Sequence, residues 1–197
     1  MTSTLMAKAL TPPDRVTDAK QFRRALGQFA TGVTVVTARS TEGRDVGLTA
    51  NSFNAVSLDP PLVLWSVDKK SSTAADFLEA DSFAVHILSL DDEHVSNQFT
   101  KSGIDRFAGM PVSRGIGGVP LLDCGVARFE CQTEHRYDGG DHVVVVGRVV
   151  TYRTVEGPPL VFHNGGYCSL TTRAAPRTQA ATIHKFAKVR DIHTGQQ

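Results

Sequence analysis

The chain has 197 residues, 41% of them hydrophobic and 21% charged, which excludes a disordered chain and favours one soluble globular domain with its own core. A formal net charge of +1 gives no electrostatic reason to expect nucleic acid or a membrane as partner. Three cysteines do not suit a disulfide framework, and the stretch MTSTLMAKALTPPDRVTDAK lacks the apolar core of a signal peptide. We therefore expect a cytoplasmic protein.

The first folded element is a helix that follows a flexible N-terminal arm at 1–17. The segment DAKQFRRALGQFATG predicts it, because four apolar residues share one helical face: Phe22, Ala25, Leu26 and Phe29. Thr17 or Asp18 can cap its start, and Gly32 suits its end.

Strands dominate the middle of the chain. Segments rich in β-branched or buried apolar residues predict three of them: 33–39, 46–58 and 62–67. The spacing of the apolar residues then changes from that of a strand to that of a helix. The segment KKSSTAADFLEA predicts a helix with Ala74, Phe77 and Leu78 on its inner face.

The second half continues the pattern of strands with helical insertions. A strand at 82–90 precedes a short helix in DDEHVSNQFTK and a loop at 101–120 that is rich in Gly and Pro. Two long strands, in LLDCGVARFECQTEH and DHVVVVGRVVTYRT, are joined by a turn at RYDGG, and PLVFHNGGYCSL supplies one more strand. Because no βαβ rhythm repeats, the sequence predicts a mainly β, antiparallel barrel or closed sheet with peripheral helices.

The two long strands differ in their alternation. In the first, Ala127, Phe129 and Cys131 share one face, and we expect the residues between them to face water: Arg128, Glu130, Gln132 and Glu134. The valine run at 143–146 is apolar on both faces, so one face can fill a barrel while the other needs a cover. We expect a second copy of the chain, in a homodimer, to provide it.

Several kinds of site are excluded by spacing. Cys124, Cys131, His135 and His142 match no common zinc pattern, and the two cysteines differ in strand parity, so we expect no metal site. The sequence has no G-x-S-x-G motif and no Walker loop, and GIGGVP lacks the third glycine of a dinucleotide fingerprint.

Three polar features are candidates for a ligand site. Thr49, Asn51 and Ser52 interrupt an apolar strand, which either marks a flat ligand at the backbone or is an ordinary half-solvated strand. Hydroxyls and lysines at 69–73 precede a helix, which either binds a phosphate or is a plain serine cap. Asp141 and His142 stand directly before the buried valine strand, where titratable groups are costly without a partner.

These motifs, in this order, resemble the short-chain NAD(P)H:flavin reductases. The resemblance covers roughly residues 18 to 170 and rests on FRRALGQFATGVTVVTA, GLTANSFNAVSLDPPLVLWSVDKKSST, GGDHVVVVGRV and PLVFHNGGY. It implies a single flavin reductase-like domain at 18–171 with a split β-barrel of the FMN-binding, Greek-key-like type. It also implies a homodimer that transfers hydride from NADH or NADPH to FMN or FAD. The reduced flavin then diffuses to a separate oxygenase.

The resemblance assigns roles to particular residues. A first group would line the isoalloxazine ring: Thr49, Ala50, Asn51 and Ser52. A second would hold the ribityl phosphate region: Ser66, Lys69, Ser71, Ser72 and Thr73. A third would lie near the outer part of the flavin or border the cleft: Asn97, Lys101, Phe107 and Tyr167. Gly140, Asp141 and His142 match the family's G-D-H motif beside the flavin and nicotinamide. There His142 would position a ring or phosphate, and Asp141 would fix the tautomer of His142 or tie the turn.

Two other readings stay open at this point. One is a flavin- or haem-binding split barrel without reductase activity, such as an electron carrier or a protein like pyridoxamine-phosphate oxidase. The other is a structural barrel that only binds a partner. The basic tail at 172–197 lies beyond the resemblance and is expected to be a solvated end.

Overall fold

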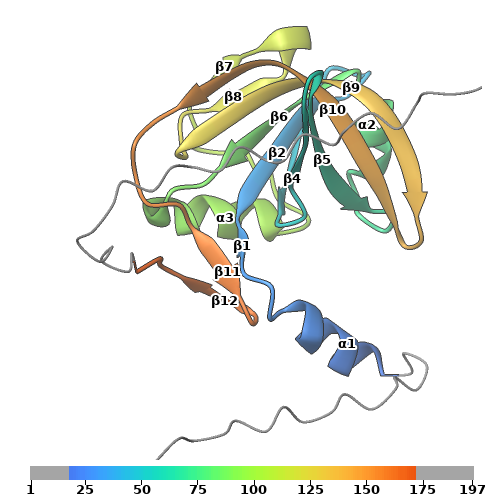
Figure 1. Ribbon diagram of the computed structural model, residues 1–197. Helices are drawn as coiled ribbons and strands as arrows, with labels where there is room; N and C mark the ends of the chain where they lie inside the picture. Colours follow the sequence, from blue (N-terminus) through green and yellow to red (C-terminus); the bar gives the residue numbers. More distant parts are fainter. Residues whose placement is uncertain (1–17, 172–197) are drawn as a thin grey trace, which may run out of the picture.

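The computed structural model describes residues 18–171, which form a barrel-like sheet with short peripheral helices (Figure 1). The helices are α1 (Ala19–Leu26), α2 (Ala74–Glu79) and α3 (Glu93–Thr100), with short 3-10 turns at Leu90–Asp92 and Ile116–Gly118. The strands are β1 (Thr31–Gly32), β2 (Thr34–Arg39), β3 (Asp45–Ala50), β4 (Asn54–Leu58), β5 (Pro61–Asp68), β6 (Ser82–Ile87), β7 (Val112–Arg114), β8 (Pro120–Leu122), β9 (Ala127–Gly139), β10 (His142–Thr154), β11 (Val161–His163) and β12 (Gly166–Cys168).

Seven antiparallel strands make the main sheet, in the order β3-β2-β6-β9-β10-β5-β4. The strands at its two edges, β3 and β4, follow each other in the chain, so the segment between them crosses from one edge to the other. There the hydroxyl of Ser52 accepts a hydrogen bond from the backbone N–H of Ser66 on β5, at 2.9 Å. This contact ties the crossing segment to β5, the neighbour of the edge strand β4, so the sheet curls into the expected split barrel.

The interior of the barrel is filled by one face of each strand. Trp65, Phe83 and Val145 are almost fully buried there, and Phe77 of α2 packs against Trp65 with ring centroids 5.0 Å apart. Their burial removes large apolar surfaces from water, which is the main favourable term in folding. The predicted inner face of α2 is confirmed for Ala74 and Phe77, which are both buried.

A second apolar cluster covers the outside of β2. Val35, Phe99 of α3 and Leu160 belong to it, so α3 is the lid on this face. Next to this cluster, the β7–β8 hairpin covers Ala84 of β6, against which Val119 and Leu121 pack. The sheet is thereby buried on both faces along β2 and β6, which accounts for their nearly continuous burial.

Helix α1 is capped as predicted, because the carboxylate of Asp18 accepts from the backbone N–H groups of Lys20 and Gln21. It ends at Leu26 instead of near Gly32, since Gly27 forms its C-cap. The helix projects from the barrel, and none of its residues is buried in the described part of the chain (Figure 1).

Other expectations need correction. The single strand expected at 46–58 is divided into β3 and β4, with the crossing segment at 51–53 between them. The segment PLVFHNGGYCSL forms the short hairpin β11–β12 instead of one strand. Glu130 does not face water: it is 8% exposed, and its carboxylate accepts from the backbone N–H of Ile116. The loop at 115–119 folds over β9 and removes this residue from solvent.

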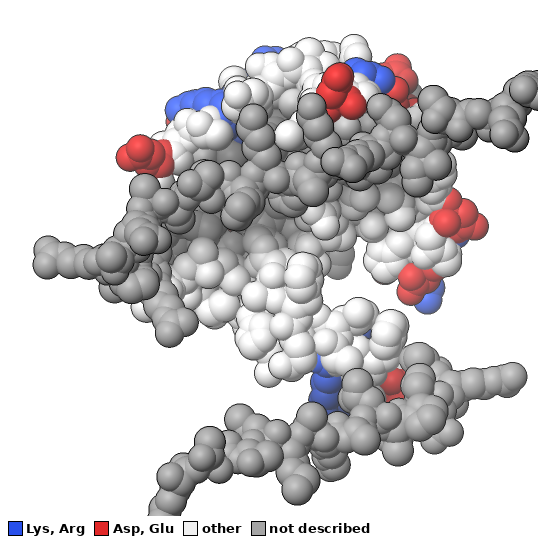
Figure 2. Space-filling view, in the orientation of Figure 1, with Lys and Arg blue, Asp and Glu red and all other residues white. Residues whose placement is uncertain are grey.

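The surface of the described residues carries scattered charges of both signs and no continuous basic patch in the view of Figure 2. Within 18–171 no helix combines the length and the apolar character that crossing a membrane requires. The N-terminal arm and the C-terminal tail expected from the sequence lie outside the described residues.

Candidate functional site

A cleft lies on the outside of the barrel where β3 approaches β5. Its central hollow has a volume of about 310 Å³. The lining residues come from β3 and the crossing segment, from the end of β5, from α3, and from the start of β10: Leu48, Thr49, Ala50, Asn51, Ser66, Val67, Asp68, Ser71, Phe99, Thr100, Arg106 and His142. The fold therefore brings together the three polar features that the sequence marked separately.

The cleft continues at both ends of β3. A hollow of about 200 Å³ shares Thr49, Ala50 and Asn51 with the central one and reaches Tyr167 on β12. A hollow of about 170 Å³ at the other end contains Ser72 and Thr73, together with the loop at 103–107. The three hollows follow one strand, so a long, flat ligand could lie along β3 and reach both ends.

The small polar residues of the crossing segment differ in what their side chains do. The hydroxyl of Thr49 donates to the carbonyl of Ser96 on α3 at 2.7 Å, and the hydroxyl of Ser52 is bonded to the backbone of Ser66. Asn51 is exposed, and its amide has no side-chain hydrogen bond among residues 18–171. Asn51 is therefore the residue of this segment with donors and an acceptor available to a ligand.

The hydroxyl-rich stretch after β5 is a turn followed by a helix of only six residues, α2. The hydroxyls of Ser71 and Thr73 are 3.2 Å apart and bond to each other, and Thr73 makes no side-chain cap. Ser72 is exposed. Ser71 lines the central hollow, whereas Ser72 and Thr73 line the neighbouring one, so this turn forms the wall between the two.

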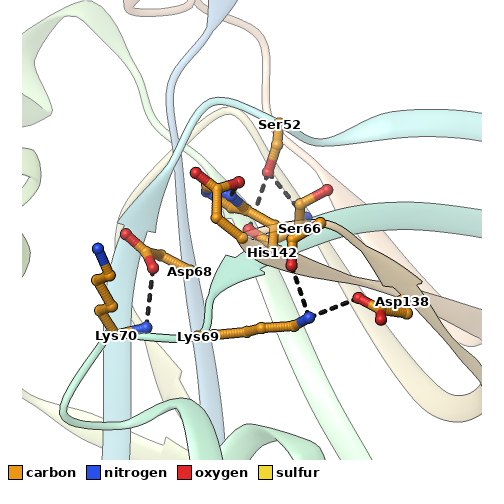
Figure 3. Close-up of polar contacts among 9 residues, drawn as sticks. Ser52, Ser66, Asp68, Lys69, Lys70, Asp138 and His142 are labelled. Carbon is orange, nitrogen blue, oxygen red and sulfur yellow. Dashed lines mark hydrogen bonds and ion pairs between the residues drawn. The ribbon is translucent and has the colours of Figure 1, made fainter.

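Asp141 and His142 lie at the tip of the β9–β10 hairpin. His142 lines the rim of the cleft (Figure 3). The Nδ1 atom of His142 lies 2.7 Å from Oδ1 of Asp141, and this hydrogen bond lowers the pKa of the Asp141 carboxyl. An ionised carboxylate can only accept, so Nδ1 carries a proton and Nε2 is the atom left to face the cleft. The turn itself needs Gly140, whose φ is +81°.

Lys69 has its ammonium turned toward the same hairpin (Figure 3). Nζ donates to the carboxylate of Asp138 at 2.5 Å and to the carbonyl of Gly140 at 2.6 Å. The sequence placed this lysine with the hydroxyls at 71–73, but here its partners belong to the β9–β10 turn.

The remaining sequence candidates are divided between the cleft and its surroundings. Tyr167 borders the cleft, and its hydroxyl lies 2.8 Å from that of Ser96 and donates to Asn97 at 3.2 Å. Phe107 packs edge-on against Phe99, with ring centroids 5.1 Å apart. Lys101 is exposed and lines none of the three hollows, so the fold does not bring it to the cleft.

Arg106 was not singled out from the sequence, although it lies in the loop expected at 101–120. Its guanidinium donates to the carbonyls of Lys101 and Gly47, both at 2.6 Å, and it lines two of the three hollows. Partial burial lowers the pKa of this group from its usual value. A lone arginine in a polar loop gives no signal in sequence, because the carbonyl of Gly47 that fixes it is 59 residues away.

Within residues 18–171 no group of three or more His, Cys, Asp and Glu side chains is arranged to hold a metal ion. Cys124 and Cys131 are free thiols, and burial raises the pKa of each to about 12. Neither is therefore a thiolate near neutral pH, which a metal ligand or nucleophile would have to be.

Comparisons with known proteins agree on one family. The model of the flavin reductase like domain matches residues 26–171. A relative named FMN reductase (NADH), from Agrobacterium fabrum, is 46% identical over 150 residues, which are 76% of this chain and 85% of that protein. The reductase subunit of a flavin-dependent monooxygenase from Rhodococcus jostii is 37% identical over 78% of each chain.

Solved structures give the same result. Component B of a nitrilotriacetate monooxygenase from Mycobacterium thermoresistibile superposes with a TM-score of 0.76 at 37% identity, covering 85% of this chain and 95% of the other. An NADH:FAD oxidoreductase from Streptomyces globisporus, solved in complex with NAD and FAD fragments, gives a TM-score of 0.75 at 35% identity. That match covers 86% of this chain and all of the other.

Proposed function

This chain belongs to the flavin reductase-like domain family, and we propose that it oxidises NADH and reduces FMN or FAD in the cleft along β3. The observation that carries the proposal is the central hollow, in which Asn51, Ser66 and His142 come together from three separate segments. Flavin-dependent hydride transfer requires orientation of two rings and a suitable electrostatic environment, and these are what a protein supplies to such a cofactor.

The walls of the cleft suit a flavin. Leu48, Ala50 and Phe99 give the central hollow apolar surface, and a few polar groups lie around it, which is the usual composition of a site for a flat ring. A bound flavin supplies the redox chemistry, by accepting a hydride from a stacked nicotinamide. Everything else falls to this chain: to bind the rings, to fix their orientation and to limit the access of water.

We assign the sequence candidates to this cleft as follows. Residues 49–52 lie along the ring, with Asn51 as the side chain that contacts its polar edge. Ser66, Ser71, Ser72 and Thr73 lie toward the ribityl and phosphate end, and Tyr167 and Asn97 close the opposite end. His142 presents Nε2 to the ligand while Asp141 holds its other nitrogen, so the ring keeps one tautomer and one orientation.

We also propose that a second copy of the chain covers the outer face of β5, β9 and β10. Half-buried Leu62, Leu64 and Val144 form an apolar stretch of this face beside Tyr137, which is 54% exposed, and the ion pair of Arg148 with Glu134 lies next to Leu62. An exposed apolar surface of this kind marks an interface more often than free surface. Val144 stands directly opposite Ser66 on β5, so a partner on this face would border the flavin cleft.

The reduced flavin has a destination in this proposal. Several relatives carry names that make them reductase components of flavin-dependent monooxygenases, including proteins from Rhodococcus jostii and Acinetobacter baylyi. We propose that this chain, like them, supplies reduced flavin to a separate oxygenase. The three hollows of the cleft are open to solvent on one side, which is compatible with release of the flavin after reduction.

One assay tests the function. Oxidation of NADH by the purified protein is followed with FMN, FAD and riboflavin in turn, and then with NADPH in place of NADH. We expect flavin-dependent consumption of NADH. A protein that binds flavin tightly without consuming either nicotinamide would instead be a flavoprotein of another kind, and absence of both properties would reject the proposed site.

A further inference from the structure

Lys69 connects two parts of the cleft that are distant in the chain. It lies in the turn after β5, while its partners Asp138 and Gly140 lie at the end of the β9–β10 hairpin (Figure 3). The backbone N–H of Lys69 also donates to the carbonyl of Asp141, at 3.0 Å. Three hydrogen bonds from one residue therefore join the turn to the hairpin tip.

The hairpin tip has little else to hold it. Strand β5 ends at Asp68, opposite His142, so the turn beyond that pair has no neighbouring strand. Gly139, Gly140 and Asp141 are all exposed. Exposed hairpin ends with few packing contacts open at low free energy, and the Lys69 contacts add to the β9–β10 pairing of His142 with Gly139 in opposing this opening.

The contacts of Lys69 lead to the cleft through a short chain of bonds. The lysine fixes the backbone of Gly140 and Asp141, and the Asp141 carboxylate in turn binds Nδ1 of His142. A displacement of the tip would therefore move the imidazole that faces the ligand.

The charge of Lys69 is already compensated within the protein. Its hydrogen bond holds the pKa of the Asp138 carboxyl below its usual value, so this carboxylate is negatively charged near neutral pH and lies directly against the ammonium. The adjacent Lys70 differs, because its ammonium makes no hydrogen bond or ion pair among residues 18–171 (Figure 3). The carboxylate and the carbonyl take two of the three N–H donors of this ammonium, so only one donor is left for a phosphate.

We propose that Lys69 is a positioning residue, which holds the hairpin tip and thereby His142 at the rim of the cleft, and that it does not bind the flavin phosphate. The proposal rests on the proposed function, since it concerns the same cleft. It assigns the same task to Asp138, which the sequence did not mark at all. In this proposal Lys69 acts on the hairpin tip, and the hydroxyls of Ser71, Ser72 and Thr73 are left to bind the phosphate.

A double-mutant cycle tests this role. The variants are Lys69→Met, Asp138→Asn and the double variant, with Lys70→Met as the matched control one residue away. Because exposed ion pairs are weak, we expect each single variant to raise the KM for NADH about two- to fivefold. The double variant should be no worse than the single ones, since both remove one interaction. Lys69→Arg should recover part of the effect.

Flavins with and without phosphate distinguish positioning from direct binding. If Lys69 positions the tip, Lys69→Met and Asp138→Asn change the affinities for FMN and riboflavin by the same factor. If it binds phosphate, Lys69→Met weakens FMN and spares riboflavin, while Asp138→Asn leaves FMN bound as tightly or more tightly. That second pattern would overturn the proposal.

Hydrogen exchange on the flavin-free protein gives a readout that needs no activity. We expect the amides of 139–142 to exchange faster in Lys69→Met and Asp138→Asn, and at the wild-type rate in Lys70→Met. Equal exchange rates in all variants would reject the positioning role of Lys69 even if the protein is an active reductase. Faster amide exchange in the variants of a protein that consumes no NADH would support the positioning role and reject the proposed function.

Discussion

The hydroxyl of Ser52 is bonded to both backbone groups of Ser66, accepting from its N–H at 2.9 Å and donating to its carbonyl at 3.2 Å. One side chain thus joins the crossing segment to β5, the strand next to the edge strand β4. It also fixes the crossing segment that carries Asn51, so barrel closure and the shape of the cleft depend on the same contact.

Replacement of Ser52 by alanine should therefore affect stability and binding together. The change leaves the N–H and carbonyl of Ser66 without this partner, so we expect the free energy of unfolding to fall by about 1–2 kcal/mol. Flavin affinity should fall as well, because the segment next to Asn51 loosens. Urea unfolding and flavin fluorescence titration measure the two effects. Ser113→Ala, on an exposed strand away from the cleft, is the control and should change neither.

Gly47 offers a second test of the cleft wall. A Cβ added there would lie 2.5 Å from the ring of Phe99 and 3.1 Å from that of Phe107, so both rings would have to move. Overpacking of this kind costs about 1–3 kcal/mol, and we expect Gly47→Ala to lower the free energy of unfolding by that amount. Because Phe99 lines the central hollow, flavin affinity should fall too.

The control for Gly47→Ala is another strand glycine with free space around it. A Cβ on Gly32 would meet nothing within 4 Å. Gly32→Ala should be neutral or slightly stabilising, since alanine restricts the unfolded chain. If the two variants unfold at the same urea concentration, the steric account of the cleft wall is wrong.

The burial of His86 leads to a prediction of how the free energy of unfolding depends on pH. It is fully buried, its Nε2 accepts from the backbone N–H of Leu122, and its Nδ1 lies 3.1 Å from the carbonyl of Val35. Burial is the main reason that its pKa is lowered from 6.5 to about 4, and the charge of Arg128 adds to the effect. The unfolded chain therefore binds more protons than the folded chain between these two values.

The sign follows from this difference. The contribution of His86 to the free energy of unfolding is fully present above pH 6.5 and is lost as the pH falls toward 4. The total loss is about 3 kcal/mol. His86→Gln should be less stable near neutral pH and should lack this part of the pH dependence. Urea unfolding across the range measures it, with exposed His163→Gln as control. Parallel pH curves for wild type and His86→Gln would contradict the assignment.

The proposed homodimer can be disrupted at Val144. This side chain lies on the outward face of β10, between Ser66 and Tyr137 of the neighbouring strands. Val144→Asp would place a charge in the proposed interface, where an unpaired charge is costly, so we expect a monomer in sedimentation experiments. Val155→Asp, at an exposed position beyond the end of β10, should leave the mass unchanged. A monomeric wild-type protein at micromolar concentration would refute the dimer directly.

Local patterns in the sequence predict most of the elements, because each depends on neighbours a few residues away. The period of Ala74, Phe77 and Leu78 predicts α2, and the apolar valine run predicts a strand buried on both faces. The division of 46–58 at Ser52 is not predictable in this way. The residue is compatible with a strand, and only its partner Ser66 on another strand explains why the chain crosses there.

The site follows the same rule. The motif resemblance identifies the residues that the cleft brings together, including Asn51 and His142, because motif order does not require knowledge of contacts. It does not reveal the contact of Lys69 with Asp138, since the two residues are 69 positions apart. Glu130 likewise reads as a solvent-facing residue of an alternating strand until the loop at 115–119 covers it. Long-range polar contacts are the part that sequence patterns leave open.

His142 gives the most direct test of the reductase mechanism. Its imidazole is 42% exposed and contributes to no apolar cluster, so His142→Ala should fold normally. Loss of the group that faces the ligand removes about one hydrogen bond to it, and we expect kcat/KM for NADH to fall roughly five- to tenfold. Steady-state kinetics with saturating flavin measure this value.

Asp141→Asn separates the orientation of the ring from its presence. An asparagine can present its amide group to Nδ1 and stabilise the other tautomer, so the proton would move to Nε2, the atom that faces the cleft. We expect Asp141→Asn to lower kcat/KM for NADH by a factor similar to that of His142→Ala. The two changes should not multiply in the double variant, because both act through one imidazole. Wild-type kinetics for His142→Ala would remove this residue from the mechanism and leave the cleft with an orienting role only.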